Sequence, residues 1–259
     1  MCTEFTRAIL RRPGENFAAG ITTSTGGAPD FAAALAQHLA YAEALRALGL
    51  SIEILPADPA YPDGEFVEDA AIVGPDWAIV TRPGAEARQG EIAAIEAALG
   101  AHFDGWSRIT APGCVDGGDI CETDDVVLIG VSERTNPEGA RQLAAILTGL
   151  GRPAELVDIR GIPSLLHLKT GIGYLGEGRM AMAPEVPDLP AFARFEAVRL
   201  APDEAFAANC VRVNDKVLVA AGAPRFMDRL AGLGYAPLAL EMSEYRKMDG
   251  GLSCLSLRF

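Results

Sequence analysis

The sequence predicts an α/β fold, because short β-type segments occur in pairs between helix-type segments along the whole chain. Five candidate helices have centres near residues 39, 92, 143, 191 and 229. Their spacing of roughly 40–50 residues is typical of repeats that stack radially or as solenoids. An ordinary α/β domain with evenly spaced helices explains the pattern equally well. No linker, low-complexity tract or charge block divides residues 1–259, so we expect a single domain.

The predicted helices cover residues 30–48, 86–99, 136–149, 189–195 and 224–233. In the first, apolar residues recur at helical spacing after Asp30, whose carboxylate can cap a helix. The second ends at Gly100, a residue that favours helix termination. The third begins with Asn136 and Pro137, a cap followed by a first-turn proline. The pattern at 189–195 is the weakest of the five.

The predicted strands cover residues 51–55, 70–73, 77–81, the neighbourhood of 120, 126–129, 156–159, 165–168, 172–175, 180–183 and 252–257. Gly74-Pro75-Asp76 separates two of them and predicts a hairpin. Each strand is short and each pair is followed by a helix. The strands therefore fit either of the two α/β arrangements.

The composition excludes several classes of protein. Hydrophobic residues make up 49% of the chain, which excludes a disordered protein. The 22 basic and 35 acidic residues give a net charge of −13, which disfavours nucleic-acid binding. No apolar run is long enough to cross a bilayer, and residues 1–5 show no export signal. We therefore expect a cytoplasmic protein without a membrane partner.

The metal-binding residue types show no ligand spacing. The cysteines and histidines are Cys2, Cys114, Cys121, Cys210, Cys254, His38, His102 and His167. The odd number of cysteines, their wide spacing and the absence of C-x-x-C argue against a disulfide framework and a zinc site. We expect a reduced protein that holds neither a metal nor another cofactor.

Cys254 and His167 are candidates for nucleophilic and acid–base chemistry. Cys254 follows Gly250-Gly251 at the start of the predicted terminal strand, where a ligand can approach the backbone. A buried cysteine that acts as a small hydrophobe is the simpler interpretation. Alternation in the strand 165–168 would place His167 and Lys169 on its polar face. A structural histidine explains that pattern as well.

Acidic and basic clusters are further candidates. Asp116-Gly117-Gly118-Asp119 could aim a carboxylate at one point, or form an ordinary hairpin turn. Residues 63–69 hold four carboxylates, which indicate either a solvated loop or a wall that binds a cation. Arg88 and Arg134 could each clamp a carboxylate, although arginines at helix starts are usually surface residues.

The order of these segments carries more information than any one of them. The chain contains FVED at 66–69, TRPGAE at 81–86, DGGD at 116–119, RTN at 134–136, HLKTG at 167–171, SEYRK at 243–247 and GGLSC at 250–254. This set resembles the dimethylarginine dimethylaminohydrolase family, bacterial type, from about Phe5 to Phe259. The family belongs to the guanidine-modifying superfamily. The resemblance implies a five-bladed α/β propeller of ββαβ repeats, the pentein fold, and it favours the radial repeat.

The resemblance also implies a Cys–His–carboxylate site without a cofactor. Cys254 matches the nucleophile, His167 the general acid/base, and Asp116 the carboxylate that orients the histidine. Asp69 matches the carboxylate that grips the substrate guanidinium, with Glu68 beside it.

The remaining matches concern the amino-acid end of the substrate. Asp63 matches the residue that binds the α-amine, and Arg88 and Arg134 match those that bind the α-carboxylate. Ile21 and Met248 match apolar positions that contribute backbone contacts. The implied partner is a small methylated arginine, and homodimers are frequent in the family.

These residue types suit the hydrolysis of a guanidinium. The group is a poor electrophile, so its carbon requires a strong nucleophile and a held cation. Attack by Cys254, with departure of dimethylamine protonated by His167, would leave a covalent thiouronium. Water activated by His167 would then release citrulline.

Two other functions are weighed against this one. Arginine and agmatine deiminases typically carry an aspartate two residues after the catalytic histidine, where this chain has Lys169. The loss of that carboxylate leaves room for N-methyl groups, which cannot donate hydrogen bonds, and therefore favours methylated arginine. A binding propeller without catalysis is the second alternative, and the joint presence of Cys254, His167 and Asp116 counts against it.

Overall fold

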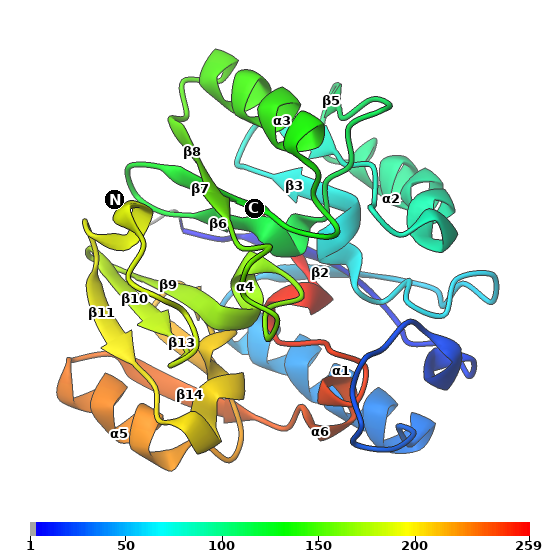
Figure 1. The fold of residues 1–259 in the computed structure, drawn as a ribbon. Coiled ribbons are helices and arrows are strands. Elements are labelled where there is room, and N and C mark those ends of the chain that lie inside the picture. The colour runs from blue at the N-terminus through cyan, green and yellow to red at the C-terminus, as the bar shows by residue number, and fades with distance from the viewer. Residues whose placement is uncertain (1–3) are drawn as a thin grey trace.

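Five three-stranded sheets repeat along the chain in the computed structural model, which describes residues 4–259. In each sheet the middle strand pairs with one antiparallel and one parallel neighbour. A helix or a 3-10 turn precedes the parallel strand, so each sheet is a ββαβ unit. The sheets surround one axis, with the longer helices at the periphery (Figure 1). The predicted five-bladed α/β propeller is therefore confirmed.

The strands of the five units, in the order of each sheet, are β15 (Leu257–Arg258), β1 (Arg7–Arg11) and β2 (Ser51–Leu55); β3 (Ala71–Val73), β4 (Ala78–Val80) and β5 (Ser107–Arg108); β6 (Ile120–Glu122), β7 (Val127–Val131) and β8 (Ala154–Asp158); β9 (Ile172–Gly176), β10 (Arg179–Met182) and β11 (Glu196–Arg199); and β12 (Val211–Val213), β13 (Lys216–Ala220) and β14 (Ala236–Leu240). The helices are α1 (Phe31–Ala47), α2 (Ile92–Leu99), α3 (Pro137–Gly149), α4 (Leu168–Gly171), α5 (Pro224–Gly232) and α6 (Ser243–Arg246).

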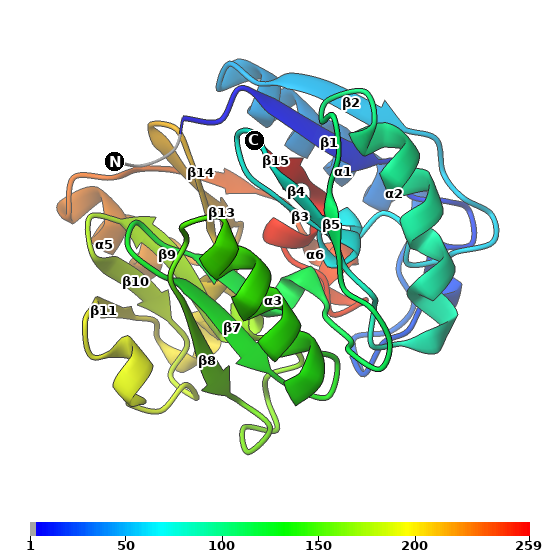
Figure 2. The same cartoon turned by 90° about the horizontal axis from the view of Figure 1, so that it is seen from above.

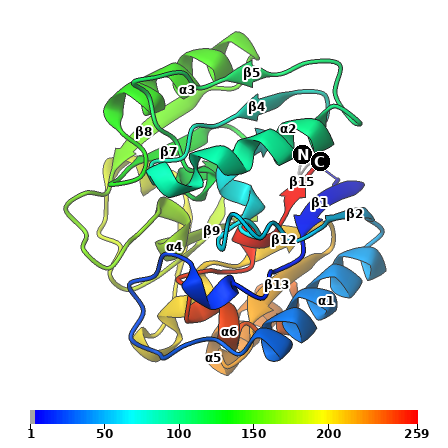
Figure 3. The same cartoon turned by 90° about the vertical axis from the view of Figure 1, so that its right-hand side faces the viewer.

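The first unit joins the two ends of the chain and closes the ring. Its first strand, β15, comes from the C-terminal end and runs antiparallel to β1, with Ala8 opposite Arg258 and Ile9 opposite Leu257. The two strands lie side by side in Figure 3. Because the first and last strands of the sequence share one sheet, β1 is paired on both sides and is not a free edge. Residues 1–3, which include Cys2 and part of the segment read for an export signal, lie outside the described chain.

A central cavity of about 750 Å³ runs along the axis of the ring. The antiparallel strand of each unit faces it, and Figure 2 shows two of these strands, β15 and β3, next to each other. The apolar core lies farther out, between the strands and the helices. In the third unit, for example, Ile129 of β7 packs against Leu143 and Leu147 of α3. Each fully buried side chain of this size contributes about 1.5–3 kcal/mol.

The capped helices agree with the sequence prediction. The Asp30 carboxylate accepts a hydrogen bond of 2.7 Å from Ala33 N at the start of α1. Asn136 does the same for Gly139 N at the start of α3, where Pro137 fills the first turn. The helix predicted at 224–233 is α5, and the hairpin predicted around 74–76 joins β3 to β4. Among residues 4–259, every helix is too short or too polar to cross a membrane.

Two predicted helices differ from the structure. The segment 86–99 begins as a 3-10 turn, Glu86–Glu91, and becomes α-helical only at Ile92. The segment 189–195 forms only a 3-10 turn, Pro190–Phe192, in place of a helix. Pro187 and Pro190 lack backbone N–H groups, and the turn buries only two side chains, so little apolar surface stabilises a longer helix here.

The strand predicted at 165–168 is wrong. Residues 165–167 form turns and α4 begins at Leu168. Side chains satisfy this backbone: Thr170 Oγ1 accepts a hydrogen bond from His167 N at 3.2 Å, and Asp119 Oδ1 accepts one from Leu168 N at 2.9 Å. The face assigned to His167 and Lys169 by strand alternation therefore does not exist.

The strand predicted at 252–257 is also largely wrong. Ser253–Leu255 forms a 3-10 turn, and only the short β15 that follows is extended. The turn forms because Ser253 N donates to Asn209 Oδ1, a side chain from another unit, and not to a neighbouring strand. The pattern at 252–257 is compatible with both conformations, since Leu252, Leu255 and Leu257 are all buried.

Candidate functional site

Most of the predicted site residues line one small pocket. Its volume is about 30 Å³, close to that of one water molecule. The lining residues are Ile21, Asp63, Phe66, Asp69, Arg88, Arg134, Leu166, His167, Met248, Asp249, Gly250 and Cys254. Asp116 lies directly behind His167, whereas Glu68 faces the central cavity.

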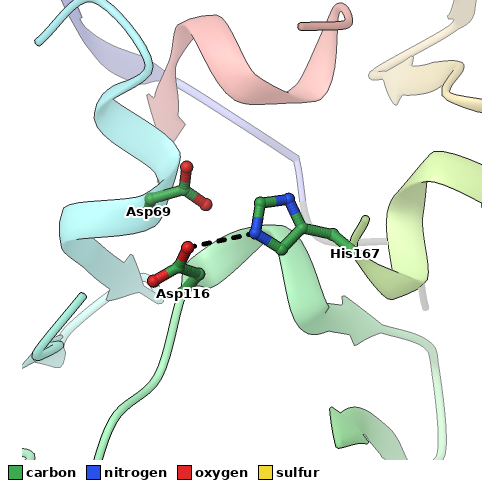
Figure 4. A group of neighbouring side chains, drawn as sticks. All are labelled: Asp69, Asp116 and His167. Carbon is green, nitrogen blue, oxygen red and sulfur yellow. Dashed lines mark hydrogen bonds and ion pairs between the residues drawn. The ribbon is translucent and has the colours of Figure 1, made fainter. Parts of the chain in front are cut away.

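His167 and Asp116 form a buried acid–base pair. His167 Nε2 lies 3.1 Å from Asp116 Oδ2, as Figure 4 shows. The other oxygen, Asp116 Oδ1, accepts a hydrogen bond of 2.7 Å from Gly84 N. Burial by itself lowers the pKa of His167, but the charge of Asp69 and the hydrogen bond to Asp116 outweigh it and raise the pKa to about 9. The imidazole is therefore protonated at neutral pH and can act as an acid.

Asp69 points into the pocket beside this pair (Figure 4). Its Oδ2 accepts a 2.6 Å hydrogen bond from Arg88 Nη1, and its Oδ1 accepts one of 2.9 Å from Gly118 N. Burial raises its pKa, yet the positive charges of His167 and Arg88 lower it to about 2 overall. Asp69 is thus an ionised carboxylate at any physiological pH and can attract a cation.

Glycine is required beside the imidazole because the backbone approaches it closely. A Cβ atom at Gly118 would lie 2.7 Å from His167 Nδ1 and 3.1 Å from Asp69 Oδ1. A Cβ atom at Gly117 would lie 1.9 Å from the carbonyl oxygen of Glu68. The glycines of the 116–119 segment therefore let three functional residues share one small volume. The segment is a 3-10 turn, Gly117–Asp119, and not the hairpin turn of the simpler interpretation.

Cys254 lies in the turn Ser253–Leu255 and contributes to the wall of the pocket. Its backbone N–H donates to Gly251 O at 3.3 Å. Burial, followed by the charges of Glu68 and Asp69, raises the pKa of its thiol to about 12. Cys254 is therefore a neutral thiol at neutral pH.

The acidic segment 63–69 is buried and not solvated. Its four carboxylate residues, Asp63, Glu65, Glu68 and Asp69, are 6%, 1%, 5% and 4% exposed. Two of them, Asp63 and Asp69, line the pocket. This finding excludes the solvated-loop interpretation and leaves a wall that can face a cation.

Asp63, Ile21 and Met248 form the outer rim of the pocket. Ile21 N lies 3.1 Å from both oxygens of the Asp63 carboxylate. Met248 is buried, whereas Ile21 is 42% exposed, so the rim faces solvent on the Ile21 side. Burial raises the pKa of Asp63, although the Ile21 N–H acts in the opposite direction.

The two predicted arginines differ in how fully they are bonded. Arg88 is buried and donates to Asp69, to both oxygens of Glu91 and to the carbonyl oxygen of Phe66. Arg134 is more exposed, and its guanidinium lies 3.7 Å from Asp116 Oδ2. Arg134 can thus turn toward a ligand carboxylate at small cost, whereas Arg88 would have to exchange bonds within the chain.

Glu68 and Lys169 form a layer between the small pocket and the central cavity. Lys169 Nζ lies 2.5 Å from Glu68 Oε1, and Ser253 Oγ donates to Glu68 Oε2 at 2.7 Å. Both charged residues line the central cavity and not the small pocket. The Lys169 side chain, which stands where deiminases typically carry an aspartate, is therefore turned toward Glu68 and not into the small pocket.

Asp69, Asp116 and His167 are also the group with metal-binding residue types that lies closest together within residues 4–259. Their ligand atoms all lie within 4.8 Å of one another. Each carboxylate oxygen already accepts a hydrogen bond or an ion pair, from Arg88, Gly118, Gly84 or His167. This bonding suits an acid–base set that holds an organic cation.

Asp119 and Leu166 contribute to the site without having been assigned a role from the sequence. Asp119 Oδ2 accepts a bond of 2.7 Å from Ser132 Oγ, while Oδ1 caps the backbone directly after His167. Leu166 lines the pocket beside the histidine. Asp119 is visible in the sequence as the last residue of the 116–119 motif. Only its contact with Leu168 N shows that it holds the backbone next to His167.

Comparisons with known proteins agree with this geometry. The arginine deiminase family model matches residues 87–220. A dimethylarginine dimethylaminohydrolase from Pseudomonas aeruginosa is 44% identical over 256 residues, which cover 98% of this chain and 100% of the relative.

Two solved structures are similar over nearly the whole fold. A cysteine-to-serine mutant of dimethylarginine dimethylaminohydrolase from Pseudomonas aeruginosa, complexed with citrulline, has a TM-score of 0.95 at 43% identity and covers 99% of this chain and 100% of its own. A dimethylarginine dimethylaminohydrolase with a histidine-to-glycine substitution, in an adduct with S-methyl-L-thiocitrulline, has a TM-score of 0.94 at 43% identity, with coverage of 98% and 100%. The resemblance found in the sequence is confirmed, and the chain belongs to the dimethylarginine dimethylaminohydrolase family.

Proposed function

We propose that this protein hydrolyses N-omega-methylated arginines, asymmetric dimethylarginine and monomethylarginine, to citrulline and dimethylamine or methylamine. The observation that carries the proposal is the placement of Cys254, protonated His167 and ionised Asp69 around one small pocket. A nucleophile, an acid and a cation-binding carboxylate are the three groups that the reaction needs. The family membership and the citrulline complex of a relative support the same reaction.

The first step forms a covalent bond to the enzyme. The substrate guanidinium binds against Asp69, and its positive charge lowers the pKa of the Cys254 thiol, which releases its proton to solvent. The thiolate sulfur attacks the guanidinium carbon. The C–N bond to the methylated nitrogen breaks as His167 donates its proton to the departing amine. The product of this step is a thiouronium on Cys254 with a neutral His167.

The second step releases citrulline. Neutral His167 removes a proton from a water molecule, and the oxygen adds to the thiouronium carbon. The C–S bond breaks and Cys254 leaves as a thiolate. The proton that remains on the added oxygen passes to solvent, which gives neutral citrulline, while His167 keeps its own proton. Asp116 holds the imidazole in one orientation through both steps and stabilises its charged form. Cys254 and His167 therefore end the cycle as the thiolate and the imidazolium that began the first attack.

The amino-acid end of the substrate would bind at the rim. Asp63 supports a positively charged α-amine, and Arg134, with Arg88 behind it, supports an α-carboxylate. Ile21 and Met248 would contribute backbone and apolar contacts at the same rim. Agmatine lacks the carboxylate that Arg134 would bind.

The orientation of the Glu68 carboxylate, away from the small pocket, supports selectivity for methylated arginine. This carboxylate is bonded to Lys169 and Ser253 on the cavity side, so it does not offer the guanidinium a second acceptor. Unmethylated arginine would leave N–H donors unpaired, at about 1–3 kcal/mol for each buried group. Methyl groups remove those donors, so we expect kcat/KM for asymmetric dimethylarginine to exceed that for arginine by at least about tenfold.

Citrulline formation tests the proposal. Purified protein is assayed with asymmetric dimethylarginine, monomethylarginine, symmetric dimethylarginine, arginine and agmatine in parallel. The proposal predicts turnover of the first two and poor turnover of the other three. Equal turnover of arginine or agmatine would instead assign the chain to the deiminases, and no turnover of any substrate would favour a binding propeller.

We further propose a cytoplasmic homodimer in which residues 1–259 form one catalytic domain. The closed ring of five sheets supports a single domain. Exposed apolar side chains on the adjoining elements α1 and β14, Leu39 and Leu238, support a contact between copies. Light scattering coupled to size-exclusion chromatography should give twice the chain mass of 27.2 kDa, and a mass of one chain would contradict the dimer.

A further inference from the structure

Asn209 links the turn that carries the nucleophile to the turn that carries the histidine. It lies directly before β12, far in sequence from both. Its Nδ2 donates to Lys169 O at 3.0 Å and to Ser253 Oγ at 3.1 Å, and its Oδ1 accepts from Ser253 N at 3.0 Å. One amide group thus joins α4, which follows His167, to the residue next to Cys254.

The backbone beside Cys254 is packed directly on this amide. A Cβ atom at Gly251 would lie 2.5 Å from both Cγ and Oδ1 of Asn209. The second glycine of the GGLSC segment is therefore explained by the close approach of Asn209, independently of the three hydrogen bonds. Any shift of the amide would move the turn that carries the sulfur.

The same amide completes a closed set of polar contacts. Ser253 Oγ also donates to Glu68, and Glu68 in turn pairs with Lys169, whose carbonyl oxygen accepts from Asn209. Glu68 is the neighbour of Asp69 in sequence, so the set reaches the backbone of the carboxylate that faces the pocket. Three functional residues from three separate segments are held in register by side chains that do not line the pocket.

We propose that Asn209 is a positioning residue for the hydrolysis: it sets the location of Cys254 relative to His167 without touching the substrate. This inference rests on the proposed function. Displacement of a reacting group by about 1 Å can cost on the order of 10²-fold in rate. The residues proposed to hold the substrate ends, Asp63 and Arg134, make no contact with Asn209, so substrate binding should be largely preserved.

The test compares Asn209→Ala with Asn214→Ala, a matched control. Asn214 also makes three side-chain hydrogen bonds, but these join Phe5 and Leu48 on the far side of β12. For Asn209→Ala we expect kcat for asymmetric dimethylarginine to fall by about 10- to 100-fold, while KM changes less than about threefold. For Asn214→Ala we expect a loss of thermal stability with kcat within about twofold of the unsubstituted protein.

A second variant keeps the test decisive if Asn209→Ala does not fold. Ser253→Ala removes one hydroxyl shared by Asn209 and Glu68 and leaves the backbone bond to Asn209 in place. We expect a fall in kcat of about 3- to 10-fold and an unchanged KM. A folded Asn209→Ala or Ser253→Ala protein with kcat within twofold of the unsubstituted protein, or with the loss confined to KM, overturns the positioning role. Absence of citrulline from the unsubstituted protein would instead overturn the proposed function.

Discussion

The small pocket and the central cavity lie on opposite sides of one polar layer and differ in almost every property. The pocket measures about 30 Å³ and the cavity about 750 Å³. The pocket collects Cys254, His167 and Asp69 from loops and turns, whereas the cavity is lined mainly by the inner strands of the five sheets. Size alone would therefore select the wrong space as the catalytic site.

The two spaces also differ in which titratable groups they bring together. Charges beside the cavity pair with each other, as Arg152 does with Glu122 and Lys169 with Glu68. In the pocket, the pKa of Asp69 is lowered, while the pKa values of His167 and Cys254 are raised. Shifted pKa values of an acid, a base and a nucleophile within one volume indicate chemistry. Beside the cavity, burial also raises the pKa values of Cys121 and Cys210 to about 12, but no histidine lies among the described residues that line it.

Replacement of the Cys254 sulfur by oxygen should give the largest difference in kcat between a change in the pocket and a change in the cavity. Cys254→Ser should lower kcat at least about 10³-fold with the fold intact, because a serine hydroxyl is not ionised by the arriving cation. Cys210→Ala, which changes a buried thiol that lines the central cavity, should leave kcat within about twofold. Citrulline release measured against a blank without enzyme decides between them, and substantial activity of folded Cys254→Ser contradicts the assignment.

A smaller effect is expected when the backbone beside the imidazole gains a methyl group. In Gly118→Ala the new Cβ would lie 2.7 Å from His167 Nδ1, so the ring must shift and its contact with Asp116 is disturbed. We expect kcat to fall by about 10- to 100-fold. Gly161→Ala is the matched control, because its Cβ would meet no atom within 4 Å. Equal kcat values for the two variants would show that the position of the imidazole is not limiting.

The ionised imidazole should also stabilise the fold in a pH-dependent way. The pKa of His167 is raised from 6.5 to about 9, so the folded state binds this proton more tightly than the unfolded state. Its stabilising effect is complete below about pH 6.5 and is lost as pH rises through about 9. Urea unfolding of the protein and of His167→Gln at pH 6, 7.5 and 9 should therefore show a difference that shrinks with pH. A difference that grows with pH contradicts the charged state.

The smallest effect is expected on the cavity side. Arg152→Ala removes a partly exposed ion pair with Glu122, 3.3 Å long, at the wall of the central cavity. Such pairs contribute about 0–1 kcal/mol to stability, and we expect kcat and KM to stay within about twofold. Steady-state kinetics with asymmetric dimethylarginine provide the measurement. A tenfold loss of kcat would show that the cavity takes part in turnover.

Local sequence signals predicted the parts of the fold that depend on neighbouring residues. The caps Asp30 and Asn136 fixed the starts of α1 and α3, because a cap bonds to backbone three residues away. The strands predicted at 165–168 and 252–257 failed because Asp119 and Asn209 bond to these backbones from distant segments. Spacing within one segment contains no information about such partners.

The site likewise has features that the sequence predicts and features that depend on distant contacts. The residue types of the pocket and their order along the chain were sufficient for the family resemblance, and eight of the predicted residues line the pocket. The direction of each side chain was not predictable. Lys169 lies in α4, where the sequence pattern indicated a strand, and it pairs with Glu68 of the turn Val67–Ala70 at the cavity wall.

The central claim is that hydrolysis proceeds through a covalent bond to Cys254 in the small pocket. The most direct test treats His167→Gly with S-methyl-L-thiocitrulline, whose leaving group departs as a thiol and needs less help from an acid. After acid quench, intact mass spectrometry should show the mass of the substrate less methanethiol, and peptide mapping should place it on Cys254. No adduct, or an adduct on Cys114, Cys121 or Cys210, would contradict the account.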